Sequence, residues 1–293
     1  MHQQESVLDK CYRGAFGAYI FVLVLLIYSG TNDPSIDSKR LLTSWAALVL
    51  TGSYILITWI TRRPLRRLPV FEKVLIGLVA LLFLRSLFSE FRAVSLLESS
   101  RFLALFSLYW LSAQIFRSTD QVLRFFNVFS VAMGVAALYA LVQAAGLDPF
   151  PWTDTTSDTY TNLPATFGNP NFAAHALILS VIMIIGSYAM GARWTPWLLP
   201  LLFFHLYRTD QRAGWIALGG AAFLVAVGWV CLRHATRPTG RVLTAVLTVG
   251  FVGVGVIGAV MYWTYLRTGF AFPLDLSLLI RYQSYVSATN MLL

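Results

Sequence analysis

Residues 125–145 read F-F-N-V-F-S-V-A-M-G-V-A-A-L-Y-A-L-V-Q-A-A, an apolar stretch without a charged side chain. About 20 such residues form a helix that crosses the roughly 30 Å hydrocarbon core of a bilayer. The whole chain has this character, because 57% of its 293 residues are hydrophobic and 12% are charged, whereas a soluble domain carries about 25% charged residues. The composition indicates an all-α, polytopic membrane helical bundle and excludes a cytosolic enzyme, a disordered tail and a secreted disulfide scaffold.

Apolar segments recur along the chain, and we predict about nine transmembrane helices in a single transmembrane domain over residues 1–293. The segments are 14–30, 42–60, 74–89, 95–116, 123–145, 171–190, 194–207, 213–232 and 242–265. The seventh segment is short and contains Pro196 and Pro200, so we expect it to be tilted, kinked or only partly spanning.

The positions of Lys and Arg predict the orientation. Most of them fall in segments that are cytoplasmic if the N-terminus is inside, above all in residues 61–73, which contain four arginines and a lysine. No Lys or Arg lies between Phe125 and Ala192, which suits a translocated external loop at residues 146–170. The bias predicts the N-terminus inside and the C-terminus outside. It also assigns the net charge of +9 to contact with the lipid bilayer, so we expect no nucleic acid partner.

Arg85, Glu98 and Arg101 are charged residues inside predicted spans, where charges are costly and usually serve a purpose. Arg85 lies beyond the middle of the third span, and Glu98 and Arg101 lie near the external end of the fourth, three residues apart on one helix face. One interpretation is a buried ion pair that fixes helix register. The other is an oxyanion site, because two arginines exceed one glutamate and a guanidinium suits a phosphate. At this depth the phosphate would belong to a lipid.

A second polar cluster lies in the external link between the seventh and eighth segments. It contains His205, Arg208, Asp210, Gln211 and Arg212. Positive residues are disfavoured outside, so the two arginines need a reason to be there. Either they snorkel to lipid headgroups, or they bind an anion. Arg212 would bind it at a helix start, where backbone N–H groups also face the ligand. Arg281, with Tyr282 and Tyr285, is a third external arginine.

Other chemistry finds little support in the sequence. No spacing of His, Cys and carboxylates suggests a metal site and no glycine-rich loop suggests a nucleotide, so we expect no cofactor. The cysteines, Cys11 and Cys231, are interpreted as reduced packing residues near the cytoplasmic face. His175, in the sixth span, is interpreted as a hydrogen-bonded core residue. Asn169 and Pro170 predict a helix start, as cap and first helical residue.

Two strings resemble signatures of a known family. T-F-G-N-P-N-F-A-A at residues 166–174 contains Gly168, Asn169, Pro170, Asn171 and Phe172, and T-D-Q-R-A-G-W follows at residues 209–215. They resemble the G-N-P-N-F and T-x-S-R-G-A-W segments of the bacterial O-antigen ligase and O-antigen polymerase-like membrane glycosyltransferases, with Gln for Ser and Ala for Gly in the second. The stretch that begins at Arg281 resembles the R-x-x-x-W-x-x-A segment of that family, with Tyr in place of Trp.

This resemblance implies a function in lipopolysaccharide or polysaccharide biosynthesis. Members transfer a glycan from an undecaprenyl diphosphate-linked donor to an acceptor hydroxyl at the periplasmic face of the bacterial inner membrane, without a metal. The acceptor is lipid A core, a growing polysaccharide or a protein. The resemblance places Arg212 and Arg281 on the diphosphate, while Arg208, Arg85 and Arg101 are diphosphate-binding candidates from the charge argument alone.

The chain departs from the family at its end. Members continue into a periplasmic segment with a histidine implicated in catalysis, and this chain stops at Leu293, so we expect it to lack the C-terminal part. Within the chain, His205, Asp210 and Glu98 are the alternative bases. Two other functions stay open at this point: a membrane transporter of a small anion, and a catalytically incomplete structural or assembly protein.

Overall fold

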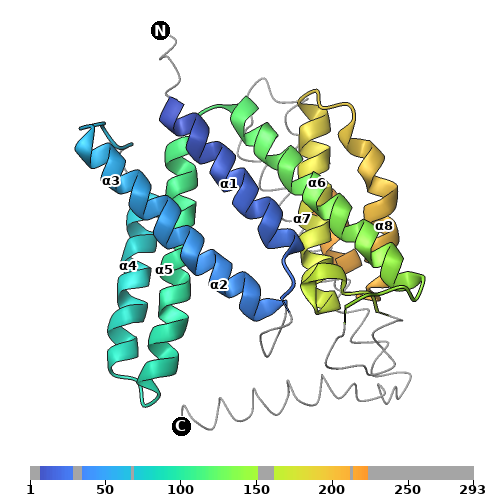
Figure 1. The fold of residues 1–293 in the computed structure, drawn as a ribbon, viewed down its shortest axis with the longest axis horizontal. Helices are drawn as coiled ribbons and strands as arrows, with labels where there is room; N and C mark the ends of the chain where they lie inside the picture. Colours follow the sequence, from blue (N-terminus) through green and yellow to red (C-terminus); the bar gives the residue numbers. More distant parts are fainter. Residues whose placement is uncertain (1–6, 29–34, 67–68, 151–161, 212–213, 224–293) are drawn as a thin grey trace, which may run out of the picture. The chain divides into compact units, whose positions relative to one another are not determined.

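The computed structural model describes residues 7–28, 35–66, 69–150, 162–211 and 214–223 (Figure 1). Within these ranges all regular secondary structure is helical. The chain divides into two compact units, residues 1–218 and 219–293, and the hydrophobic cores and cavities of the described residues lie in the first. Because the second unit is described only at residues 219–223, the single domain over 1–293 stays a prediction.

The helices follow the predicted segments closely. The first seven segments fall on helices, the eighth begins as a short apolar helix, Gly214–Phe223, and the ninth, 242–265, lies outside the described residues. The elements are α1 (Val7–Leu25), α2 (Ile36–Ala46), the π-helical turn η1 (Ala47–Thr51), α3 (Gly52–Ile60), α4 (Val70–Leu87), α5 (Arg92–Ile115), α6 (Thr119–Ala144), the 3-10 turn η3 (Ala165–Phe167), α7 (Pro170–Ala189), the 3-10 turn η4 (Thr195–Leu198) and α8 (Leu199–Arg208).

Three helices of the described part are long and apolar enough to cross a bilayer. They are Ile36–Ile60, in which α2, η1 and α3 run on without a break, α6 and α7. The helices α4 and α5 each contain three charged residues, and η4 with α8 spans only Thr195–Arg208, about 21 Å at 1.5 Å per residue. The fold is therefore that of a helical membrane protein, while the nine spans and their orientation stay predictions.

Most helices begin a few residues before the predicted positions, and the difference is largest for α1 and α2, which begin at Val7 and Ile36 where residues 14 and 42 were predicted. In α1 the early charged residues have partners, because the Arg13 guanidinium donates to the Ile115 carbonyl over 2.7 Å and Asp9 lies 3.8 Å from Arg117. In α2 the ammonium group of Lys39 donates to the Thr166 carbonyl over 2.6 Å. A search for apolar runs does not find these helical turns, because they contain charged residues. The charged side chains are stabilised by partners far away in the sequence.

Contacts between the helices sort their ends into two groups (Figure 1). The first group contains the start of α1, the end of α5 and the residues after α3. Arg13 of α1 donates to the Ile115 carbonyl of α5, and the Arg66 N–H donates to the Gln114 side chain over 2.9 Å. The other joins Val24, Lys39 and Thr166. This alternation agrees with the sides that the sequence predicts for these residues, the first group inside and the second outside.

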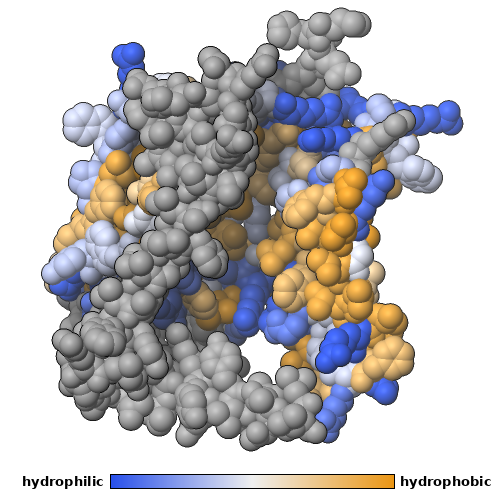
Figure 2. Space-filling model, turned by 180° about the vertical axis from the view of Figure 1, so that it is seen from behind, coloured by the Kyte–Doolittle hydropathy of each residue, from blue (hydrophilic) through white to orange (hydrophobic). Residues whose placement is uncertain are grey.

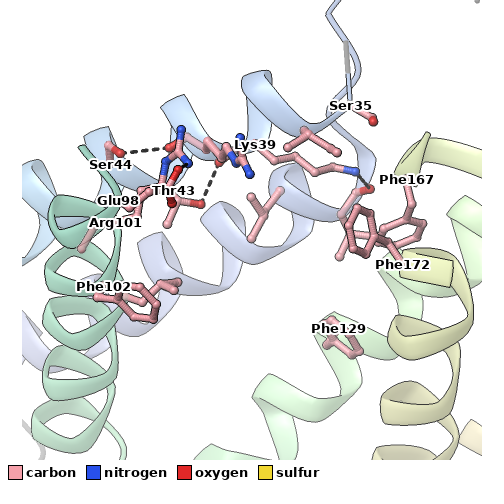
Figure 3. A pocket seen from close by; sticks show the side chains of 16 residues that line it. Ser35, Lys39, Thr43, Ser44, Glu98, Arg101, Phe102, Phe129, Phe167 and Phe172 are labelled. Carbon is pink, nitrogen blue, oxygen red and sulfur yellow. Dashed lines mark hydrogen bonds and ion pairs between the residues drawn. The ribbon is translucent and has the colours of Figure 1, made fainter. Parts of the chain in front are cut away.

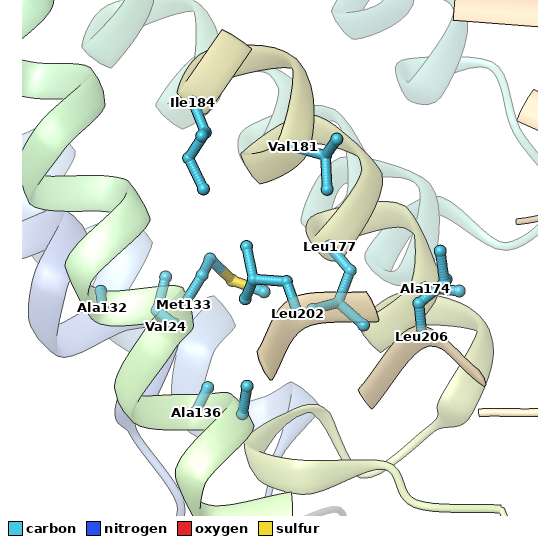
Figure 4. Close-up of a cluster of buried hydrophobic side chains, with 11 residues drawn as sticks. Val24, Ala132, Met133, Ala136, Ala174, Leu177, Val181, Ile184, Leu202 and Leu206 are labelled. Atoms are coloured by element: carbon cyan, nitrogen blue, oxygen red, sulfur yellow. The ribbon is translucent and has the colours of Figure 1, made fainter. Parts of the chain in front are cut away.

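The main core lies between α1, α6, α7 and α8 (Figure 4). Met133 of α6, Leu177 of α7 and Leu202 of α8 are fully buried there. Small residues on α6 allow the close approach of its neighbours, and a Cβ on Gly134 would lie 3.2 Å from the Leu198 side chain. A second core of aromatic and aliphatic residues joins α1 to α3 and α5.

The hairpin of α4 and α5 has an apolar outer surface. Leu78, Leu81 and Leu84 are exposed on α4, and Figure 2 shows hydrophobic residues over this side of the molecule with hydrophilic residues at both ends. Such a band suits acyl chains between two headgroup regions.

On α7, His175 is exposed, while Ala174 and Ile178 are buried. The interpretation of His175 as a core residue is therefore wrong, because it lies on the face away from the core.

Candidate functional site

A cavity of about 540 Å³ lies where α1, α2, α5 and α6 meet the start of α7 (Figure 3). Ligand pockets commonly measure about 300–1,000 Å³. Its lining is largely apolar, with Leu23 and Val24 from α1, Phe102 and Leu105 from α5, and Phe129 from α6. Leu23 and Val24 lie near the end of α1 that belongs to the second group, whereas Phe102, Leu105 and Phe129 lie toward the middle of their helices.

One wall of the cavity is charged. Lys39 and Arg40 of α2 and Glu98 and Arg101 of α5 line this part of the cavity. The Lys39 side chain extends away from Glu98 and Arg101 toward Phe167 (Figure 3). Arg101 forms an ion pair with Glu98 one helical turn away, and Arg40 lies 3.8 Å from Asp37. An ion pair between Arg101 and Glu98 is therefore present, but it is not the predicted buried pair, because the Glu98 side chain is 51% exposed. Three cations against one carboxylate leave the lining with a surplus of positive charge.

The opposite wall contains two aromatic residues of the T-F-G-N-P-N-F string, Phe167 and Phe172 (Figure 3). Phe172 is 48% exposed. Between the two phenylalanines the chain turns at Gly168, whose φ of +68° favours glycine. Asn169 then caps α7, since its side-chain oxygen accepts from the Asn171 N–H over 2.8 Å, and Pro170 is the first helical residue. The predicted helix start is confirmed.

Lys39 connects the charged wall to this string. Its ammonium group donates to the carbonyls of Thr166, over 2.6 Å, and Val24, over 3.3 Å, and lies 4.5 Å from the centre of the Phe167 ring. The Thr166 hydroxyl also donates to the Val24 carbonyl, over 2.6 Å. These contacts fix the string to α1 and α2 at the edge of the cavity.

The segment before the string is held from α6. The Ala165 N–H donates to the Gln143 side-chain oxygen over 2.9 Å, at a residue whose φ is +48°. The Gln143 amide donates to Asp148 over 2.8 Å, and the Tyr139 hydroxyl donates to the same carboxylate over 2.6 Å. Because Gln143 is buried, this network fixes both Asp148, after the end of α6, and Ala165, before the string.

The histidine of the second polar cluster supports the segment before the string. His205 is fully buried, and its Nε2 lies 3.2 Å from the Leu163 carbonyl. The Leu163 N–H donates to the Arg208 carbonyl over 3.0 Å, so the end of α8 supports the same segment. Of the three alternative bases, His205, Asp210 and Glu98, only Glu98 is among the described residues that line the cavity.

The structure separates the predicted arginines. Arg101 lines the cavity, whereas Arg85 lines a second cavity between α4 and α5. Arg208 ends α8 outside the lining of both, and Arg212 and Arg281 lie outside the described residues. The structure thus brings Arg101 and Glu98 together with Phe172 of the family-like string in one cavity, whereas Arg85 lines the second cavity.

Lys39 and Arg40 were not predicted as site residues. Both lie in a segment predicted to be external, where positive residues are disfavoured. Arg208 and Arg212 were selected because they are positive residues in a segment predicted to be external, and the same criterion would have selected Lys39 and Arg40.

Comparison of the chain with protein-family models, with curated proteins and with solved structures finds no match.

Proposed function

We propose that this cavity binds the diphosphate of an undecaprenyl diphosphate-linked glycan, and that the chain transfers the glycan to an acceptor hydroxyl at the periplasmic face of the bacterial inner membrane. One observation carries the proposal. The charged residues Lys39, Arg40 and Arg101 and the aromatic residues of the family-like string line a single cavity. Arg101, a candidate from its charge, and Phe172, part of the family-like string, thus line the same cavity.

The chemistry of the lining suits a lipid-linked diphosphate. Guanidinium and ammonium groups donate charge-assisted hydrogen bonds to phosphate oxygens, and the apolar walls accommodate hydrocarbon. As the glycan leaves, negative charge grows on the diphosphate, and cations fixed in an apolar surrounding stabilise that charge without a metal. Glu98 holds the Arg101 guanidinium at the cavity. Arg212 and Arg281 belong to this proposal through the resemblance alone, as further diphosphate ligands.

The proposal requires the cavity to lie at the periplasmic side, with the N-terminus inside, the C-terminus outside and nine spans. We expect an alkaline phosphatase fusion after Pro164 to be active and one after Arg66 to be inactive, because the two residues belong to opposite groups of helix ends. The measurement is phosphatase activity in whole cells at equal fusion abundance. The reverse pattern would place the cavity on the cytoplasmic side and contradict the proposal.

A single substitution tests the charged wall. Arg101→Gln should weaken binding of the undecaprenyl diphosphate-linked glycan by about 10–100-fold, since one charge-assisted hydrogen bond contributes about 1.5–3 kcal/mol. Arg92→Gln is the matched control, because Arg92 starts the same helix and does not line the cavity. Binding to the purified chain is measured first, followed by glycan transfer to a lipid A core acceptor. Equal affinities in the two variants would remove Arg101 from the site.

A further inference from the structure

A second cavity, of about 620 Å³, lies between α4 and α5 and is open to the outer surface of the hairpin, since the exposed residues Leu78 and Leu81 line it. Among the described residues of its lining Arg85 alone is charged, and the others are aliphatic or aromatic, among them Leu75, Val79 and Tyr109. This composition does not suit a soluble anion. It suits a hydrocarbon chain that carries a negative charge at one end.

The two cavities are neighbours. Phe102 and Leu105 line both of them, and because they are three residues apart they lie on one face of α5. These two side chains separate the cationic cavity from the apolar one. A ligand that passes this pair would occupy both cavities.

The charged residue of the second cavity lies at one of its ends. The Ser86 and Ser99 hydroxyls are hydrogen-bonded over 2.6 Å, so Arg85, next to Ser86, lies at about the level of α5 that carries Arg101. Leu75 lies ten residues earlier on α4, about 15 Å along the axis at 1.5 Å per residue. The apolar part of the cavity therefore extends from the level of the charged wall toward the other end of the hairpin.

We propose that the second cavity holds the hydrocarbon chain of the polyprenyl donor, with its phosphates beside Arg101 and Arg85 at the polar end. The chain passes Phe102 and Leu105 and then follows α4 toward Leu75. This inference rests on the proposed function and adds a site for the lipid tail. It also gives Arg85 a role at the entrance of the tail site, outside the lining of the cationic cavity.

Chain length is the variable that tests this site. Undecaprenyl diphosphate and geranyl diphosphate share a head group, and only the long one fills the second cavity. In detergent at fixed concentration, we expect the full chain to bind undecaprenyl diphosphate at least about tenfold more tightly than geranyl diphosphate. Val79→Trp fills the cavity and should remove this difference while leaving the affinity for geranyl diphosphate unchanged. Ile76→Trp is the control, because Ile76 is 41% exposed on the same helix and does not line the cavity.

The outcomes separate the two proposals. If wild type binds neither diphosphate, the proposed function fails. If wild type binds both equally, or if Val79→Trp behaves like Ile76→Trp, the tail site is wrong while the phosphate site stands. Loss of both affinities in Val79→Trp would also overturn the tail site, because the substitution would then act on the head group or on folding. Retained binding of geranyl diphosphate shows that the variant is folded.

Discussion

The double variant Lys39→Met, Arg101→Gln should bind undecaprenyl diphosphate about a thousandfold more weakly than wild type, because it removes two charge-assisted hydrogen bonds that contribute about 1.5–3 kcal/mol each. The two residues come from different helices and line the same cavity. The variant also leaves Glu98 without its Arg101 partner, so the lining loses its positive surplus. Equilibrium binding to the purified chain is the measurement.

A second double variant matches the change in charge. Lys73→Met, Arg92→Gln removes one ammonium and one guanidinium from the starts of α4 and α5, and neither residue lines the cavity. It should bind undecaprenyl diphosphate as wild type does. If both double variants weaken binding equally, the lipid responds to the overall charge of the protein, and the cavity is not the binding site.

Lys39 also supports the fold, and its two roles are separable. Lys39→Met leaves the Thr166 carbonyl without the bond from the ammonium group, so some loss of thermal stability accompanies the loss of binding. Lys39→Arg keeps the charge. It should restore most of the affinity even if the melting temperature stays below that of wild type. Stability and affinity that fall together in both variants would assign Lys39 to the fold alone.

Leu177→Ala should lower the free energy of unfolding by about 2–5 kcal/mol, the range for removal of a buried leucine side chain. Leu177 is fully buried between α6, α7 and α8 (Figure 4). Leu179, two residues later on the same helix, is 45% exposed, and Leu179→Ala should cost less than about 1 kcal/mol because it opens no cavity in the core. The comparison uses thermal unfolding of both variants in one detergent.

This pair tests which face of α7 packs against the protein. A larger loss in Leu179→Ala than in Leu177→Ala would reverse the two faces of the helix. The aromatic wall at Phe172 would then be rotated away from the charged residues. The arrangement of the candidate site would be wrong together with the core.

Much of the helical arrangement could be predicted from the sequence, because apolar runs of sufficient length have few alternatives to a helix in a membrane. The predicted start of α7 at Pro170 is confirmed, since a cap and a proline at the first position are local signals. The starts of α1 and α2 could not be predicted in this way. Their early turns contain Asp9, Arg13 and Lys39, whose partners lie far away in the sequence.

The candidate site was predictable only where its geometry is local. Glu98 and Arg101 are three residues apart on one helix, so their ion pair follows from helix geometry. The contact between Lys39 and Thr166 joins residues 127 positions apart, and no local pattern encodes it. Arg85 has the chemistry of a phosphate ligand, but the packing of α4 on α5 determines which cavity it lines.

The most direct test of the proposed site is an experimental structure of the protein with undecaprenyl diphosphate bound. We expect phosphate oxygens within about 3 Å of guanidinium or ammonium nitrogens of Arg101, Arg40 or Lys39, with the hydrocarbon chain leaving past Phe102. A diphosphate bound elsewhere, with this cavity empty or filled by side chains, would contradict it.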